Sequence, residues 1–561
     1  MQFKSKSELW KIHGRLYDLS NYMKRHPGGE TILKQTRGQG DLSALFESYH
    51  AFSDIEKIYD SLHKWEIDKE LILRDDWDSE FEEDEDEEDE EEEHEEEEED
   101  EKEEDEKEED DDEEDEEEEH EEEEEDEDDE KTLDTELVII SRIGFDSDNE
   151  SKSTDSYNQI EEIDKDEEEI DEEESEEEDE EQEIEELEEE EIVPYGEFDF
   201  TSYRKLAKQV KHLFPNRESV KAPIEWYIIV IYMASTFLFT FYFALLVDNS
   251  FYHSTNQNDI NSHTFLQTTL TMIASISWMS LGFNVMHDAS HYAISTQPSV
   301  NIYLSKLYNG LNLWNSKIWF YHHVLNHHSF TGLLYRDPDV SHYYPFGTKK
   351  IEDNSKSIWD CTHRFQEYFI PFLLFVFPGQ NVSQAITYQI AGYRRKLWRM
   401  KLPDQSQLPE IYDPIDIAGM FITLACFQIA ILRGNILYLA LFLMFNNVIY
   451  ALNIIFDHDS FESIVTNDYQ GKDWLRLQIH HSSNFLNHNP LWTRVFGSIN
   501  HQIEHHLFPN VSNYYYPEIK PIVEEYCLEH DIPYVHHLTL FDAWKSFIAT
   551  LRYNKNTIKT Q

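Results

Sequence analysis

Long apolar runs interrupt an otherwise polar sequence at four places after residue 200. They cover residues 224–247, 264–286, 414–432 and 436–456. A helix needs about 20 apolar residues to cross a bilayer, so each run predicts a transmembrane helix. Only Arg433 to Asn435 separate the last two runs, which predicts a tight helical hairpin. A shorter run, Tyr368–Phe377, is about half the required length and predicts an interfacial or re-entrant helix.

The spans form two out-and-back pairs, so the N-terminus, residues 287–413 and the residues after 457 are expected on one side. The loop Asp248–His263 contains no Lys or Arg. The segment before the first span, in contrast, contains Arg204, Lys205, Lys208, Lys211, Arg217 and Lys221. By the positive-inside rule, the shared side is predicted to be cytosolic. Residues 1–20 lack the apolar core of a signal peptide, which agrees with a cytosolic start.

Composition adds a long acidic tract to this picture. The chain has 561 residues and a formal net charge of −74, and nearly all of that charge lies between Asp75 and Tyr195. Such a tract repels itself and cannot bury a core, so it is predicted to be a disordered linker. It divides the chain into an N-terminal module (1–74), the linker (75–195) and a membrane domain (196–561). We interpret the linker as a solvated tether; the alternative is a segment that binds basic surfaces, such as those of a reductase or a nuclear protein.

The N-terminal module carries a histidine pattern typical of a haem pocket. His26 precedes Pro-Gly-Gly, whose turn lets the backbone approach a large planar ligand. A predicted helix ends at His50, and its apolar face is formed by Leu42, Leu45, Phe46 and Tyr49. Histidines on opposite walls of an apolar crevice would hold both axial positions of a haem, whose iron then transfers electrons instead of binding O2. The alternative is a small domain whose turn happens to contain a histidine.

Three histidine clusters lie in the membrane domain. The first, HDASH, follows the second span and contains His287 and His291. The others are HVLNHH, with His323, His327 and His328, and QIEHH, with His505 and His506. Histidines four residues apart share one helix face, and all three clusters lie on the predicted cytosolic side. Both His501 and Gln502 could complete the third cluster, because each lies four residues before one of its histidines.

These seven cluster histidines exceed the roughly four ligands of one tetrahedral zinc and suit two metal ions. The three cysteines, Cys361, Cys426 and Cys527, form no CxxC and indicate neither a thiolate site nor a disulfide framework. A haem delivers electrons one at a time, which iron can accept and zinc cannot. Reduced iron activates O2 toward unactivated C–H bonds, and the membrane places acyl chains beside it. The residues alone therefore predict a di-iron, O2-dependent oxidase of lipid chains.

With these motifs, the chain resembles two families. Residues 8–73 resemble cytochrome b5, and residues 201–551 resemble membrane fatty-acid desaturases, in particular the front-end desaturases that carry an N-terminal cytochrome b5 domain. The resemblance implies haem b with axial ligands His26 and His50. It implies two non-haem irons held by His287, His291, His323, His327, His328, His505 and His506, with a further ligand at His458.

The resemblance also makes Gln502 the residue that completes the third cluster. Imidazole binds iron better than a neutral amide, which favours His501 instead. We assign the position to Gln502 and keep His501 as its rival. His322, His480 and His481 match none of the family's histidine motifs, and we interpret them as surface or outer-layer residues.

The resemblance further implies a fold and a function. The expected fold is an α-helical integral membrane desaturase domain with four transmembrane helices and a cytosolic histidine-rich cap, preceded by a small α+β haem domain. The expected reaction uses O2 to insert a cis double bond toward the carboxyl end of an unsaturated acyl chain, on a fatty acyl lipid or acyl-CoA. The expected partners are the endoplasmic reticulum membrane and an NAD(P)H-dependent cytochrome b5 reductase, and no nucleic acid.

Two other functions fit the same sequence. A sphingoid-base desaturase or a lipid hydroxylase would use the same iron site. A protein of another class would be an inactive membrane protein whose acidic tract mediates interactions, and the complete histidine clusters argue against it.

Overall fold

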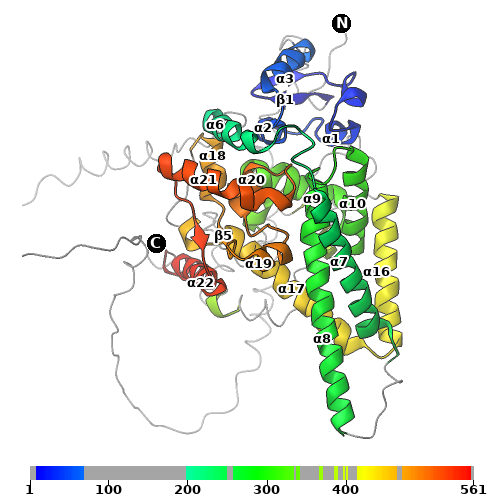
Figure 1. The fold of residues 1–561 in the computed structure, drawn as a ribbon. Helices are drawn as coiled ribbons and strands as arrows, with labels where there is room; N and C mark the ends of the chain where they lie inside the picture. Colours follow the sequence, from blue (N-terminus) through cyan, green and yellow to red (C-terminus); the bar gives the residue numbers. More distant parts are fainter. Residues whose placement is uncertain are drawn as a thin grey trace, which may run out of the picture. The chain divides into compact units, whose positions relative to one another are not determined.

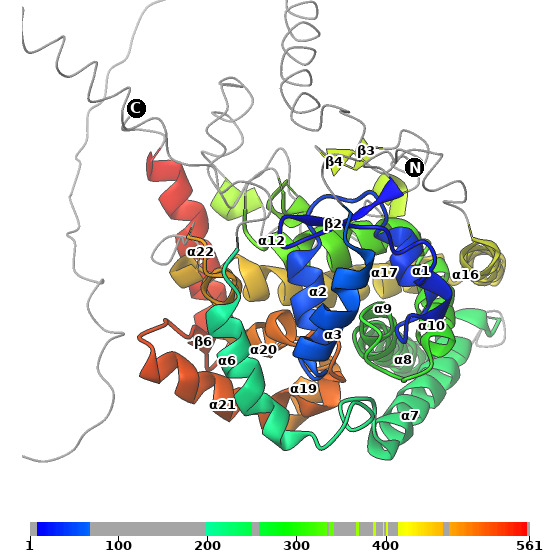
Figure 2. The same ribbon diagram turned by 90° about the horizontal axis from the view of Figure 1, so that it is seen from above.

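The computed structural model describes residues 8–67, 198–248, 257–333, 336–341, 366–369, 385–388, 396–397, 400–401, 413–463 and 471–557. The acidic tract lies outside these residues, as does all of the short apolar run except Tyr368 and Phe369. Met1–Arg74 and Glu191–Gln561 belong to one unit of the chain. Figures 1 and 2 show this unit in two views.

The N-terminal module combines a short hairpin with small helices. Strands β1 (Trp10–Ile12) and β2 (Arg15–Tyr17) are antiparallel, with Trp10 opposite Tyr17. Between them, Gly14 has a φ of 69°, a left-handed conformation that glycine adopts readily. The hairpin is followed by η2 (Met23–Arg25), α1 (Glu30–Gln35), α2 (Ser43–His50), α3 (Ile55–Leu62) and η3 (His63–Trp65). This is the α+β module that the sequence predicts.

In the described part of the chain, four helices are long and apolar enough to cross a membrane, as predicted. The first comprises α7 (Ile224–Phe241) and the π-helical turn η6 (Tyr242–Leu246). The second comprises α8 (Gln257–Leu281), the π-helical turn η8 (Gly282–His287) and α9 (Asp288–Ser290). The others are α16 (Pro414–Leu432) and α17 (Ile436–His458), joined through Gly434 with a φ of 77°. Helix α8 packs against both α7 and α17.

The second membrane helix is longer than its apolar run predicts. It extends from Asn258 to Ser290, whereas the run covers residues 264–286. Polar residues continue the helix before the run, and the first histidine cluster continues it afterwards. The first histidine cluster therefore sits on the end of a membrane helix and not on a separate one.

Close packing against a membrane helix anchors the segment that leads into the second histidine cluster. Helix α10 (Pro298–Leu311) packs on α16, and a Cβ on Gly310 would lie 2.2 Å from the carbonyl oxygen of Asp416. The buried carboxylate of Asp416 accepts a hydrogen bond of 2.7 Å from the hydroxyl of Ser316. Ser316 begins α11 (Ser316–Trp319), which is thereby fixed to α16.

Short helices carry the second and third histidine clusters. Helix α11 continues into the π-helical turn η9 (Phe320–His327) and α12 (His328–Phe330), followed by η10 (Pro338–Ser341). The C-terminal helices are α18 (Trp474–His480), α19 (Pro490–Val495), α20 (Gln502–Leu507), η12 (Asn513–Tyr515), α21 (Tyr516–Glu529) and α22 (Leu540–Thr557). Helices α18 and α21 pack against α6 (Thr201–Val210), which η5 (Lys211–Leu213) extends.

The remaining strands are short. β3 (Lys396–Leu397) and β4 (Met400–Lys401) are antiparallel, and β5 (Asn484–Phe485) pairs in parallel with β6 (His536–His537).

Candidate haem and metal centres

His26 and His50 face each other across a crevice of the N-terminal module. Their ring centroids are 6.3 Å apart. Two metal–nitrogen bonds of about 2 Å, plus half a ring width on each side, account for such a separation. The Nδ1 atom of His26 lies 3.3 Å from the Gly29 carbonyl oxygen, and that of His50 lies 2.7 Å from the Phe46 carbonyl oxygen. These bonds leave both Nε2 atoms for a metal between the rings.

The crevice fits a flat apolar ligand with two axial histidines. It is part of a cavity of about 280 Å³ whose walls include Trp10, Ile32, Leu45 and Phe46. Gly28 is needed there, because a Cβ at this position would lie 2.8 Å from Cε1 of His26. Burial, followed by the neighbouring His50, lowers the pKa of His26 to about 4, so its imidazole is neutral near pH 7 and can bind a metal. The geometry suits a haem with two histidine ligands.

Irregular helical turns bring the first two histidine clusters together. His287 ends the π-helical turn η8, and His323 and His327 lie on the π-helical turn η9. The wider π-helical turn rotates successive side chains by less than an α-helical turn does, and such turns occur frequently at functional sites. The sequence prediction assumed regular α-helices at both places, and this local geometry is therefore a correction to it.

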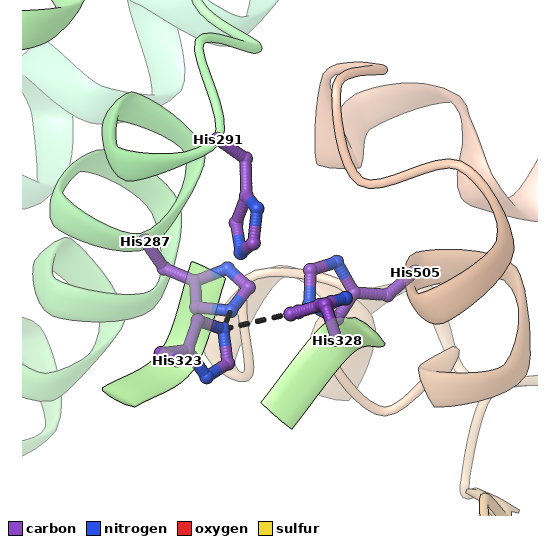
Figure 3. Close-up of side chains that lie close together, drawn as sticks. All are labelled: His287, His291, His323, His328 and His505. Carbon is purple, nitrogen blue, oxygen red and sulfur yellow. Dashed lines mark hydrogen bonds between the residues drawn. The ribbon is translucent and has the colours of Figure 1, made fainter. Parts of the chain in front are cut away.

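Five histidines from all three clusters converge in one group, shown in Figure 3. His287 Nε2 and His323 Nε2 are 2.9 Å apart, and His328 Nε2 lies 3.2 Å from His323 Nε2. His291 and His505 complete the group, in which one nitrogen from each ring lies within 4.8 Å of the others. We call these five residues the first metal group. All five are buried.

Three further histidines form a second metal group, in which one nitrogen from each ring also lies within 4.8 Å of the others: His327, His458 and His506. The side-chain amide of Gln502 adjoins it, with Nε2 2.7 Å from His458 Nε2 and 3.2 Å from His506 Nε2. The two groups touch, because the rings of His328 and His506 are stacked with centroids 4.3 Å apart. The structure therefore places all nine predicted ligand residues, Gln502 included, at two adjacent sites.

Five of the histidines have a hydrogen-bond partner on the ring nitrogen Nδ1. The Nδ1 atom of His327 lies 2.9 Å from Asp337, and that of His458 lies 2.8 Å from the His481 carbonyl oxygen. The Nδ1 atoms of His291, His505 and His506 lie 2.9, 3.1 and 2.9 Å from Tyr49, Tyr516 and Gln478. Such outer partners orient a ligating imidazole and set which nitrogen carries the proton.

The inward-facing atoms fit metal ions. The Nε2 atoms of His291 and His505 are buried and lack a hydrogen-bond partner among the described residues. The Oε1 atom of Gln502 is also buried without such a partner, and its Nε2 atom is the one that faces His458 and His506. Burial lowers the pKa of His323, His328, His505 and His506, so these rings are neutral and offer lone pairs. Burial alone would lower the pKa of His327 too, but Asp337 and Asp339 raise it to about 9, which makes it a more basic ligand. An all-imidazole set of this size suits two irons.

Several residues near the groups were not among the ligands that the sequence predicts. Asp337 and Asp339 belong to the LYRDPDV segment, and Asp339 lies 3.2 Å from His327 Nδ1 and 2.6 Å from His322 Nε2. His322 is 2% exposed and lies in this outer layer. The position of Asp337 and Asp339 shortly after the second histidine cluster was the sequence signal that could have identified them as partners of its histidines. Tyr49, Gln478 and Tyr516 carried no local signal, because they are distant in sequence from the rings that they contact.

His501, the rival of Gln502, lies outside both metal groups in the described part of the chain. It is fully buried, and its Nδ1 atom lies 3.7 Å from Oε2 of Glu504. Burial alone would raise the pKa of Glu504, but His501 and the hydroxyl of Tyr534 lower it. His501 thus faces a buried carboxylate, and Gln502 faces the second metal group.

Comparisons with known proteins agree with this geometry. Residues 261–538 match the model of the fatty acid desaturase family, and residues 1–68 match that of the cytochrome b5-like haem/steroid-binding domain. An acyl-lipid (8-3)-desaturase of Mortierella alpina is 28% identical over 309 residues, which are 52% of this chain and 65% of that protein. The aligned part thus spans just under two thirds of that relative.

Two other relatives are similarly distant. An sn-1 linoleoyl-lipid 6-desaturase of Synechocystis is 25% identical over 304 residues, 50% of this chain and 77% of that protein. A probable Delta(5) fatty acid desaturase C of Dictyostelium discoideum is 24% identical over 315 residues, 53% of this chain and 66% of that protein.

Proposed function

We propose that this chain, which belongs to the fatty acid desaturase family and carries a cytochrome b5-like domain at its N-terminus, is an O2-dependent desaturase of membrane lipids. The observation that carries the proposal is the convergence of three histidine clusters into two adjacent metal groups beside a bis-histidine haem pocket. The relatives named above are desaturases of fatty acyl chains. We assign this chain the insertion of a cis double bond toward the carboxyl end of an unsaturated acyl chain.

The reaction is balanced as follows. Two hydrogen atoms leave adjacent carbons of the acyl chain, and O2, two further electrons and two protons yield two molecules of water. Bound irons supply the activation of O2, and bound haem supplies the electrons singly. The protein contributes the nine ligand side chains proposed above and the hydrogen bonds that orient them.

An apolar opening beside the metal groups offers a place for the acyl chain. A small cavity of about 60 Å³ reaches His287, His327 and Gln502, and its apolar walls are formed by Phe283, Met286, Trp319, Tyr450 and Ile454. Phe283 and Met286 lie on η8, and Tyr450 and Ile454 lie on α17, so the walls belong to membrane helices. An acyl chain entering between these helices would meet the metal groups without crossing water.

Topology and partners follow from the same proposal. With both termini and the histidine clusters on the cytosolic side of the endoplasmic reticulum membrane, the haem module is accessible to a soluble or membrane-bound electron donor. An NAD(P)H-dependent cytochrome b5 reductase is the expected donor, because a haem held by both His26 and His50 would have no open position for O2 and would exchange electrons only.

Replacing His50 by alanine is expected to remove the absorption spectrum of a low-spin bis-histidine haem, because one axial nitrogen is lost. Desaturation driven by NADH and reductase should be lost with it. His63→Ala is the matched control: this histidine belongs to the same module, is about half exposed and contacts Glu66. Its variant should keep both haem and activity. A wild-type chain that binds no haem after incubation with excess haemin would contradict the assignment.

Lipid analysis of cells that express the full chain tests the reaction itself. When the cells are supplied with a defined diunsaturated fatty acid, a product with one more double bond, nearer the carboxyl end, is expected in the acyl lipids. Cells expressing His505→Ala provide the baseline. A new double bond in sphingoid bases, or a hydroxylated chain without a new double bond, would replace the proposed reaction by one of its alternatives. No lipid change with both cofactors bound would contradict a desaturase.

A further inference from the structure

We propose that Tyr49 forms the electronic link between the haem pocket and the first metal group. The inference rests on the proposed function, since it concerns how electrons reach the iron centre. Tyr49 is the residue before His50 on α2, so its backbone is bonded directly to that of a proposed haem ligand. Its hydroxyl oxygen lies 2.9 Å from Nδ1 of His291, a proposed iron ligand. One side chain therefore separates the two cofactor sites.

The orientation of His291 matches this role. Its Nε2 atom is buried and lacks a hydrogen-bond partner in the described part of the chain, and it faces the first metal group. With a metal on Nε2, Nδ1 carries the hydrogen and donates it to the Tyr49 oxygen. The Tyr49 and His291 ring centroids are 6.5 Å apart. The phenol is thus a direct outer partner of a metal ligand, as Tyr516 is for His505.

Other contacts hold α2 at this place. The side-chain amide of Asn510, which follows the third histidine cluster, donates a 2.8 Å hydrogen bond to the Tyr49 carbonyl oxygen. Arg204 Nε donates a 3.0 Å hydrogen bond to Glu47, which is 2% exposed. Burial alone would raise the pKa of Glu47, but hydrogen bonds from His13, Arg204 and Tyr59 lower it to about 2, so the ion pair persists at neutral pH. Helix α2 also lies against α12, which carries His328 (Figure 2).

The haem cavity itself extends to the same contact. Its walls include His26 and His50 on the one hand, and Tyr292 and Asn510 of the membrane domain on the other. Tyr292 is the residue after His291, so the cavity borders the first histidine cluster. The haem pocket and the first metal group are neighbours joined through Tyr49, and no diffusing carrier is needed between them.

Each transfer from haem to iron moves a single electron. With both cofactors bound, each electron lost by reduced haem would reduce one iron of the centre, and two such electrons would match the two that one desaturation consumes. Tyr49 keeps its hydrogen throughout, because the proposed role requires only its hydrogen bond to His291. The residue acts as a hydrogen-bonded bridge and undergoes no net chemical change.

The experiment measures haem reoxidation in the full chain loaded with haem and iron. The haem is reduced anaerobically with NADH and a cytochrome b5 reductase, then mixed with O2 and vesicles of a diunsaturated phospholipid, and the loss of ferrous haem absorbance is followed. The chain loaded with haem alone gives the background rate. Outer partners of metal ligands typically contribute 10–100-fold to activity, so Tyr49→Phe should slow reoxidation by about tenfold or more.

Tyr321→Phe is the matched control. The Tyr321 hydroxyl donates a 2.7 Å hydrogen bond to the Gln35 carbonyl oxygen. Like the Tyr49 hydroxyl, it joins the membrane domain to the haem module, but Gln35, the residue that accepts its hydrogen bond, is not a proposed metal ligand. Its loss should leave the rate close to that of the wild type. An unchanged rate in Tyr49→Phe, or an equal slowing in both variants, would overturn the proposal. So would iron loss in Tyr49→Phe, which would reduce Tyr49 to a residue that positions His291.

A second measurement separates this proposal from the proposed function. When haem and iron are both reduced with dithionite before O2 is added, the link is bypassed. Tyr49→Phe and wild type should then form the same amount of product in a single turnover. Less product from the variant would overturn the link, because a defect would remain after the bypass. Absence of product from the wild type would overturn the desaturase function instead.

Discussion

Replacing His505 by alanine is expected to abolish desaturation and to lower the iron content, while the haem spectrum is retained. His505 belongs to the first metal group, where its ring contacts those of His287, His291 and His328, and its Nε2 atom has no hydrogen-bond partner within the described structure. Loss of an outer partner alone typically costs 10–100-fold in metal affinity or activity, so loss of the ligand should cost more than roughly a hundredfold. Iron analysis, product analysis and haem absorbance of one preparation test this.

The matched control is His530→Ala. His530 is also on the C-terminal part of the chain, but its Nδ1 atom lies 2.9 Å from the Tyr526 carbonyl oxygen and its ring stacks on Tyr526, away from both metal groups. This variant should bind about two irons per chain and remain active. His327→Ala should behave as His505→Ala does, because it removes a ligand of the second group. Full activity in either cluster variant would mean that the reaction occurs elsewhere.

Much of this fold follows from local patterns. The apolar runs predict the four membrane helices because a bilayer imposes a minimum length that few soluble segments reach. The helix ending at His50 is predictable from the spacing of Leu42, Leu45 and Phe46, and it ends at the predicted residue. The sequence did not predict the full extent of α8, because polar residues at its start are helical without being apolar.

The candidate site also has features that the sequence predicts and features that it does not. The convergence of the cluster histidines was predictable because seven of them occur in short clusters at helical spacing. The outer partners were not, because Tyr49 and His291 are 242 residues apart and only the fold brings them together. The π-helical turns at η8 and η9 were not predictable either, since they satisfy packing around the metal groups and have no local sequence signal.

The choice between His501 and Gln502 depended on one helix boundary. Both residues lie four positions before a histidine, so a continuous helix would put both on the ligand face. Helix α20 begins at Gln502, and His501 is its N-cap with φ −105° and ψ 55°. That non-helical backbone turns His501 away from the face that carries His505. Helix boundaries are the least predictable part of secondary structure, so helical spacing alone did not decide between the two residues, and the choice of Gln502 rested on the family resemblance.

Gln502→Ala is accordingly expected to remove most desaturation, by roughly tenfold or more if Gln502 acts as a ligand or as an outer partner of one. Its amide lies between His458 and His506, and an amide turned by 180° places its oxygen toward the metal side of these rings. Gln502→Glu keeps an oxygen at this place and should retain iron. Iron content and single-turnover product distinguish a loss of metal from a loss of chemistry.

His501→Tyr should keep most activity, because His501 lies outside both metal groups in the described part of the chain and faces Glu504. His501 is fully buried, so a tyrosine could disturb packing, and His501→Asn serves as a smaller polar replacement. Haem absorbance verifies that each variant is folded. If both His501 variants lose iron while Gln502→Ala retains it and remains active, the assignment is reversed: His501 is then the ligand, and α20 must begin one residue earlier when iron is bound.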